Sequence, residues 1–191
     1  RLELRASRWK DRRNAIVSET RLRYPEAKTT PASGDDMSTA LAPEFSLPAT
    51  AGQTVTMSAL RGRKLVLYFY PKDNTPGCTT EAMQFRDHHK DFIKAGAVVF
   101  GVSRDNLASH EKFKSNLELP FELIADTEEK LCHMFGVVKN KIMYGKKVKG
   151  IERSTFLIDA EGVMRAEWRG IKVAGHVDEV LKAVKALKKG A

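Results

Sequence analysis

Residues 64–82 read KLVLYFYPKDNTPGCTTEA, and this stretch decides the fold. Its first part, KLVLYFY, is apolar or aromatic after the leading lysine, which is typical of a strand buried on both faces of a sheet. Prolines, a glycine and an Asp-Asn pair then interrupt the pattern and predict a loop over residues 73–77. Apolar residues recur at helical spacing after the loop and predict a helix over residues 79–94.

The alternation of strands and helices continues on both sides of this stretch. Two short strands are predicted before it, at 43–47 and 54–57. Further strands follow at 97–103, 121–125, 154–159 and 163–168, the last two as a hairpin, with helices at 106–115, 128–135 and 177–187. This order predicts an α/β fold with a mixed central β-sheet flanked by helices.

Residues 1–36 differ in composition from the rest of the chain. Arginines crowd the segment, and the breaker-rich sequence TTPASGDD closes it. The Arg12-Arg13 pair has no apolar run behind it, and acidic residues are interspersed, so neither a secretory signal nor an organelle transit peptide fits. Met37 resembles a natural start. We expect a basic N-terminal extension over residues 1–36, disordered or non-native, and a folded domain over residues 37–191.

The composition is that of an ordinary globular protein with a basic surface. The 191 residues are 42% hydrophobic and 30% charged, with a formal net charge of +9. No run approaches the roughly 18 apolar residues of a membrane-spanning helix. We interpret the charge as a solvated surface and expect neither a membrane nor a nucleic-acid partner. The only cysteines, Cys78 and Cys132, exclude a disulfide framework and indicate a reducing, cytoplasmic compartment.

Cys78 stands where a thiol becomes nucleophilic. It lies in the first turn of the predicted helix, where free backbone N–H groups and the helix dipole favour the thiolate. Pro71 would end the strand and shield the sulfur, and Thr75 offers a hydroxyl to the sulfur or to a substrate oxygen. A thiolate that attacks oxygen also needs a fixed cation nearby. We expect Arg153, just before a predicted strand, with Arg86 as the second candidate.

From about residue 42 to residue 187, the chain resembles a peroxiredoxin, and within that family the bacterioferritin comigratory protein (PrxQ) group. The signature P-x-x-x-T-x-x-C is met by Pro71, Thr75 and Cys78, and the string YFYPKDNTPGCTTEA is close to that of the group. The stretch RSTFLID, which contains Arg153, resembles the arginine strand of the family. The resemblance implies that Thr75 and Arg153 orient a peroxide at Cys78 and that Glu81 helps to hold the arginine.

The same resemblance implies the fold, the reaction and the partners. It implies a thioredoxin-like fold and the reduction of hydrogen peroxide and organic hydroperoxides, to water and alcohols, through a sulfenic acid on Cys78. Thioredoxin or a similar dithiol reductant would restore the thiol, without cofactor or metal, and the usual form is a monomer. The role would be antioxidant defence.

The second cysteine departs from the pattern of the group. Many members carry a resolving cysteine five residues after the first, and Met83 occupies that position here. Cys132 lies on the apolar face of a short predicted helix. It is either a buried structural thiol or a resolving cysteine that reaches Cys78 by local unfolding. If Cys132 is structural, a thiol of a partner protein resolves the sulfenic acid on Cys78. The residues leave these alternatives open.

Two other functions are compatible with parts of the sequence. A thioredoxin-type oxidoreductase would share the fold, but it needs a Cys-x-x-Cys pair, which Cys78 lacks. A binding module with a sensor cysteine would explain the basic charge, with the basic run 139–149, predicted as a surface loop, as its contact surface. That function gives no reason for the combination of Thr75, Cys78 and Arg153, so a thiol peroxidase is favoured.

Overall fold

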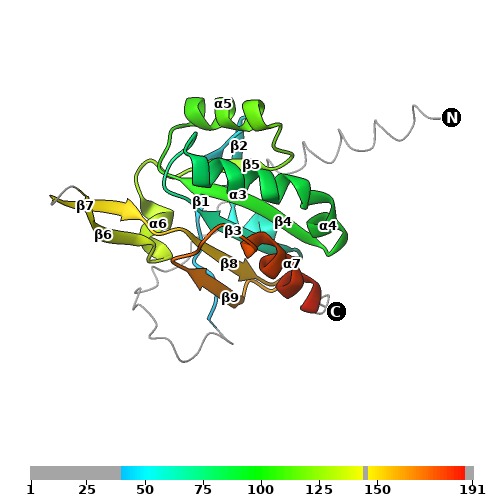
Figure 1. Cartoon of the computed structure of the whole chain (residues 1–191). Coiled ribbons are helices and arrows are strands. Elements are labelled where there is room, and N and C mark those ends of the chain that lie inside the picture. The colour runs from blue at the N-terminus through cyan, green and yellow to red at the C-terminus, as the bar shows by residue number, and fades with distance from the viewer. Residues whose placement is uncertain (1–39, 144–145, 188–191) are drawn as a thin grey trace. The chain divides into compact units, whose positions relative to one another are not determined.

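The computed structural model describes residues 40–143 and 146–187, with side chains except those of residues 141–147 (Figure 1). The basic extension expected over residues 1–36 lies outside these described residues. The domain expected over residues 37–191 is described over the ranges just given, and no helix within them is long and apolar enough to cross a membrane.

The centre of the described fold is a mixed β-sheet. Its strands are β1 (Ser46–Ala49), β2 (Gln53–Thr56), β3 (Lys64–Phe69), β4 (Ala97–Ser103), β5 (Glu122–Ala125), β8 (Ser154–Ile158) and β9 (Met164–Arg169). Among the described residues they form one seven-stranded sheet in the order β2-β1-β5-β4-β3-β8-β9. β3 is parallel to β4 and antiparallel to β8. The predicted α/β fold with a mixed sheet is confirmed.

The run KLVLYFY forms the central strand because its side chains are buried on both faces. All of β3 is buried. Val66 and Tyr68 join the core cluster on one face, whereas Leu65, Leu67 and Phe69 join the cluster on the other. The alternation follows from the two-residue period of a strand. A strand between two cores cannot carry an exposed polar side, which explains the continuous apolar run.

Helices cover both faces of the sheet. They are α2 (Met57–Leu60), α3 (Pro76–Asp87), α4 (His89–Lys94), α5 (Leu107–Leu117), α6 (Lys130–Met134) and α7 (His176–Ala186). α3, α4, α5 and α7 supply buried residues to the core cluster that contains Tyr68, and α2 and α6 supply them to the cluster that contains Phe69. The site described below lies where β3 leads into α3 (Figure 1).

The single helix predicted over residues 79–94 is wrong. α3 ends at Asp87 and α4 begins at His89, with His88 between them at φ −92° and ψ 0°. Phe85 and Phe92 are both buried, and their ring centroids are 5.8 Å apart. Both rings belong to the core cluster that contains Tyr68, so α3 and α4 pack on the same face of the sheet.

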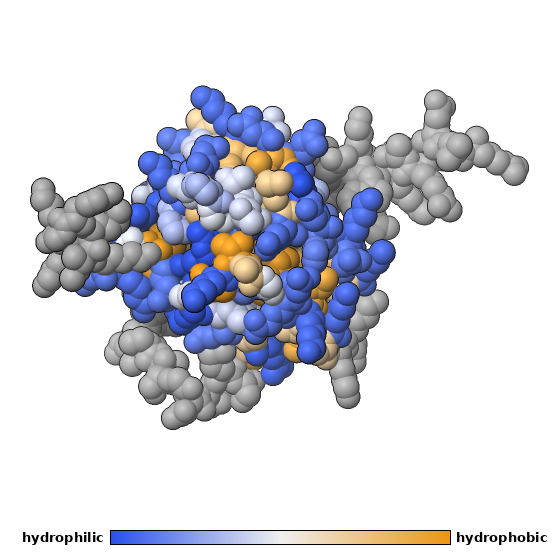
Figure 2. Space-filling view, viewed as in Figure 1, coloured by the Kyte–Doolittle hydropathy of each residue, from blue (hydrophilic) through white to orange (hydrophobic). Residues whose placement is uncertain are grey.

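The surface loop predicted over residues 139–149 is also wrong. β6 (Val138–Met143) and β7 (Lys146–Ile151) pair as an antiparallel ribbon, which projects beside α6 (Figure 1). The alternating sequence VKNKI over residues 138–142 has the two-residue period of a strand, and this signal outweighs the high charge. The face of the molecule in Figure 2 is mostly hydrophilic, with small separate apolar areas.

Candidate active site

Cys78 is the third residue of α3, which begins directly after the loop that follows β3. Thr75 is the N-cap residue, Pro76 occupies the start of the helix, and the Thr79 N–H donates to the Thr75 carbonyl at 2.9 Å. Proline suits this position because it has no N–H to leave without a partner. Cys78 has only 1% of its surface exposed. The sulfur thus sits at the positive end of a helix, with little access for water.

Arg153 provides the cation next to this sulfur. Its Nη2 donates to Cys78 Sγ at 3.2 Å. The strand register explains the placement, because Ser154 pairs with Phe69 at the end of β3 and Arg153 directly precedes Ser154. Burial by itself would lower the pKa of Arg153, but Glu81 and Cys78 raise it above its ordinary value. The arginine is therefore a permanent cation held against the sulfur.

Glu81 holds the other side of the guanidinium. It lies one turn after Cys78 on the same face of α3, is fully buried, and its Oε2 pairs with Arg153 Nη1. Its Oε1 has no hydrogen-bond partner among the described residues. Burial raises the pKa of Glu81 to about 7, although Arg153 acts in the opposite direction. The expected contact between Glu81 and the arginine is present.

Gly77 leaves room for the arginine. A Cβ atom on Gly77 would stand 3.3 Å from Arg153 Nη2, which is tighter than an ordinary contact. The φ angle of Gly77 is not positive, so the backbone does not require glycine here. The close approach of the guanidinium explains the small residue before the cysteine.

Three further residues were expected at the site: Thr75 and Pro71 lie in the segment between β3 and α3, and Arg86 lies within α3. Thr75 Oγ1 donates to the Lys72 carbonyl at 3.0 Å, and among the described residues it has no hydrogen bond to Cys78. Pro71 is partly buried and lies two residues after the end of β3. Arg86, the second candidate cation, turns away: it donates to the Leu117 carbonyl at 3.0 Å and to Asp87 at 2.9 Å.

Cys132 lies in a different environment on α6. It is fully buried and belongs to the core cluster of Phe69, whereas Cys78 belongs to the cluster on the other face of the sheet. Its N–H donates to Asp126 Oδ2 at 2.7 Å. Burial, and then Asp126, raise the pKa of the Cys132 thiol well above its ordinary value. Both cysteines are free, and Cys132 is held as a protonated thiol.

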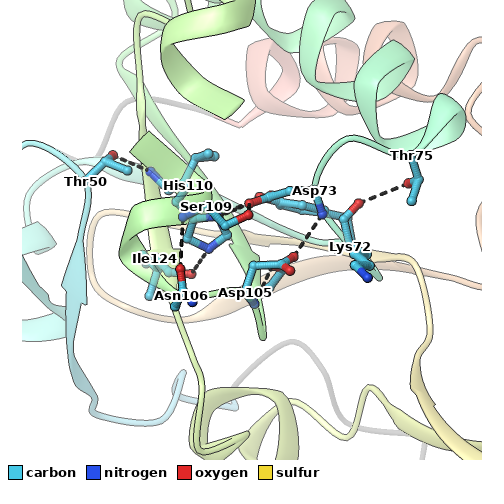
Figure 3. A network of polar contacts seen from close by, with 12 residues as sticks. Thr50, Lys72, Asp73, Thr75, Asp105, Asn106, Ser109, His110 and Ile124 are labelled. Carbon is cyan, nitrogen blue, oxygen red and sulfur yellow. Dashed lines mark hydrogen bonds and ion pairs between the residues drawn. The ribbon is translucent and has the colours of Figure 1, made fainter. Parts of the chain in front are cut away.

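Sequence reasoning missed a buried polar network around Asp73, within the loop that precedes Cys78. The carboxylate of Asp73 meets Tyr70, Ser109 and His110, the last two from α5 (Figure 3). A histidine three residues before the buried Phe113, on the inner face of a predicted helix, was the available signal. No group of three or more residues that could hold a metal ion occurs in the described part of the chain.

Comparisons with known proteins agree with this geometry. The model of the AhpC/TSA family matches residues 39–167. Peroxiredoxin Bcp of Bacillus subtilis is 52% identical over 144 residues, 75% of this chain and 92% of the relative. A structure of Xanthomonas campestris Peroxiredoxin Q matches with a TM-score of 0.72 at 51% identity, covering 74% of this chain and 90% of that one.

A second structure extends the similarity to a stated activity. It comes from work on the alkyl peroxide reduction activity of the Xanthomonas campestris bacterioferritin comigratory protein. It matches with a TM-score of 0.72 at 50% identity, again over 74% of this chain and 90% of that one. The likeness therefore spans nearly the whole length of these relatives.

Proposed function

As a member of the AhpC/TSA family, and within it of the Bcp peroxiredoxins, the chain is a thiol peroxidase, and we propose that Cys78 attacks the peroxide. The observation that carries this proposal is the 3.2 Å contact between Arg153 Nη2 and Cys78 Sγ in the first turn of α3. The guanidinium stabilises the negative charge of the thiolate and holds the sulfur in a fixed position for attack.

The proposed step moves one oxygen to sulfur. The Cys78 thiolate attacks the terminal oxygen of the peroxide, an S–O bond forms and the O–O bond breaks. Sulfur is oxidised to a sulfenic acid, and the other oxygen leaves as hydroxide or alkoxide, which takes a proton from solvent. Arg153 stabilises the negative charge as it moves from sulfur to the leaving oxygen.

Thr75 and Pro71 complete the proposed binding site. Because Thr75 Oγ1 donates its hydrogen to the Lys72 carbonyl, its lone pairs remain to accept the hydrogen of a peroxide. Pro71 shields the sulfur at the end of β3. Glu81 keeps the Arg153 guanidinium in position from its other side. These roles make the site complementary to a small molecule with an O–O–H group.

We propose hydrogen peroxide and organic hydroperoxides as substrates. The support is the alkyl peroxide reduction activity stated for the Xanthomonas campestris relative. In the proposed step, Cys78, Thr75 and Arg153 act only on the two oxygens of the peroxide, so nothing depends on the group behind them. The biological role would be antioxidant defence in the cytoplasm, in agreement with two free cysteines.

For recycling, we propose a thioredoxin-like dithiol protein acting on a monomer. Cys132 is buried on the other face of the sheet with a high thiol pKa, which argues against its acting as the resolving thiol. A thiol of the reductant attacks the sulfenic acid, releases water and forms a mixed disulfide with Cys78. The second thiol of the reductant then breaks this disulfide, so the reductant leaves oxidised and Cys78 is restored.

Intact mass after one equivalent of hydrogen peroxide, without reductant, tests both proposals. We expect one oxygen added at Cys78 in the native chain and in Cys132→Ser, and no addition at this position in Cys78→Ser. A mass lower by a pair of hydrogens, with a peptide map that links Cys78 to Cys132, would make Cys132 the resolving thiol. An unchanged mass of the native chain would refute attack by Cys78.

A further inference from the structure

Asp73 ties the loop before Cys78 to the core. Its carboxylate, almost fully buried, accepts from Tyr70 at 2.8 Å and from Ser109 at 2.7 Å. Its N–H donates at 2.8 Å to Asp105, which also accepts from Ser103 at 2.8 Å. Besides the bond from Tyr70, which directly follows β3, Asp73 thus holds the loop to α5 through its side chain and to the turn after β4 through its backbone (Figure 3).

His110 of α5 closes this network and is itself fully buried. Its Nδ1 lies 2.9 Å from Asp73 Oδ2, and its Nε2 lies 3.2 Å from the Ile124 carbonyl. Both partners are acceptors, so each ring nitrogen needs a hydrogen to make its contact favourable. A neutral imidazole has one N–H only, and would leave a lone pair facing an acceptor. The ring therefore fits its surroundings as an imidazolium.

Several hydrogen bonds offset the burial of Asp73. Burial by itself would raise the pKa of Asp73, but hydrogen bonds from His110, Ser109 and Tyr70 and the charge of His110 bring it below its ordinary value. The groups that contact the imidazole are Tyr70, which directly follows β3, Asp73 from the loop and Ile124 from β5, and Ser109 of α5 donates to the same Asp73 oxygen. Asp73 is the one carboxylate that contacts the ring among the described residues. With an imidazolium at this place, the two would form a buried ion pair.

We propose that His110 is a positioning residue for Cys78: as a buried imidazolium, it anchors the Asp73 loop that carries Thr75 and leads into α3. The inference rests on the proposed attack by Cys78. The link to the site is short, because the Lys72 carbonyl next to Asp73 accepts from Thr75 Oγ1 at 3.0 Å. Between them Asn74 has a φ of 57°, a left-handed conformation that the anchored loop must hold.

Two substitutions separate the two contacts of the ring. The amide nitrogen of Asn occupies the place of Nδ1, so His110→Asn keeps a donor to Asp73 and loses the one to Ile124. The amide nitrogen of Gln occupies the place of Nε2, so His110→Gln keeps a donor to Ile124 and loses the one to Asp73. If His110 only stabilised the fold, both substitutions would slow the oxidation of Cys78 to a similar extent. If His110 positions the loop through Asp73, His110→Gln slows it more than His110→Asn.

The rate of Cys78 sulfenic acid formation with hydrogen peroxide, followed by mass spectrometry, provides the kinetic test. Misplaced catalytic groups can cost about 100-fold, and we expect His110→Gln to react at least about tenfold more slowly than His110→Asn. Thermal unfolding of both variants serves as the control for folding. Equal rates in the two variants would overturn the inference.

Nitrogen NMR of the native chain tests the ring without relying on any variant. At neutral pH we expect both ring nitrogens of His110 to carry hydrogens and to show imidazolium shifts. One unprotonated ring nitrogen would overturn the inference even where Cys78 reacts normally. If the ring is charged but native Cys78 fails to form a sulfenic acid, the proposed function fails instead, and the role of His110 in positioning fails with it.

Discussion

The carboxylate of Glu81 is paired with the Arg153 guanidinium through one oxygen, and its other oxygen has no hydrogen-bond partner among the described residues. A buried carboxylate with one satisfied oxygen is a poor site for a full negative charge. This relationship places a group with a raised pKa directly behind the cation that contacts Cys78. It leads to the first prediction, on pH.

The rate of Cys78 oxidation should fall as pH drops below about 7, where Glu81 becomes protonated and loosens its hold on Arg153. Glu81→Gln should remove this part of the pH dependence, because glutamine does not titrate. Stopped-flow rates of the two proteins on both sides of pH 7 provide the measurement. Parallel pH profiles would show that Glu81 does not act through its charge.

The same shift has a consequence for stability with a defined sign. The pKa of folded Glu81 is raised from 4.5 to about 7, so the folded chain binds this proton more tightly than the unfolded chain. The stability contributed by Glu81 is present below pH 4.5 and is lost as pH rises through 7. The free energy of unfolding of the native chain, minus that of Glu81→Gln, should therefore fall over this range in urea titrations.

Arg153→Ala should slow the oxidation of Cys78 by about 100-fold, as removal of a charge stabiliser in a preorganised site does. Arg86→Ala is the matched control, because Arg86 lies on α3 itself but donates to the Leu117 carbonyl. It should leave the rate within about a factor of two. Competition with a standard peroxide-consuming enzyme measures both rates, and the reverse ranking would assign the cation to Arg86.

Gly77→Ala should separate stability from reactivity. Alanine in place of glycine favours a helix by up to about 1 kcal/mol, so the free energy of unfolding should stay the same or increase. The new methyl group would stand 3.3 Å from Arg153 Nη2 and push the guanidinium from Cys78. We expect a slower reaction with peroxide in a chain that is no less stable, as measured by urea unfolding and stopped-flow kinetics side by side.

Cys132→Ala should affect folding rather than chemistry. The thiol is fully buried in the core cluster of Phe69, so its loss should cost roughly 1 kcal/mol, as is common for a single core substitution. The rate of Cys78 oxidation and the turnover with a thioredoxin-like reductant should stay within about a factor of two. Loss of turnover with normal oxidation of Cys78 would mean that Cys132 takes part in recycling.

Local chemistry could be predicted from the residues themselves. The apolar run KLVLYFY can bury all of its side chains only in a strand between two cores, so it determined the central strand. The breaker residues before Cys78 predicted that a helix begins close to the thiol, although α3 starts at Pro76, three residues before the predicted position. These features depend on residues that are adjacent in the chain, so they can be predicted from the sequence alone.

Only the tertiary structure decided which distant groups meet the sulfur and its loop. Arg153 and Arg86 were both suitable cations, and the register of β3 with β8 selected Arg153. His110 and Asp73 are separated by 37 positions, and their contact depends on the packing of α5 against the loop. Such contacts arise from the summed geometry of strands and helices, so no local pattern in the chain records them.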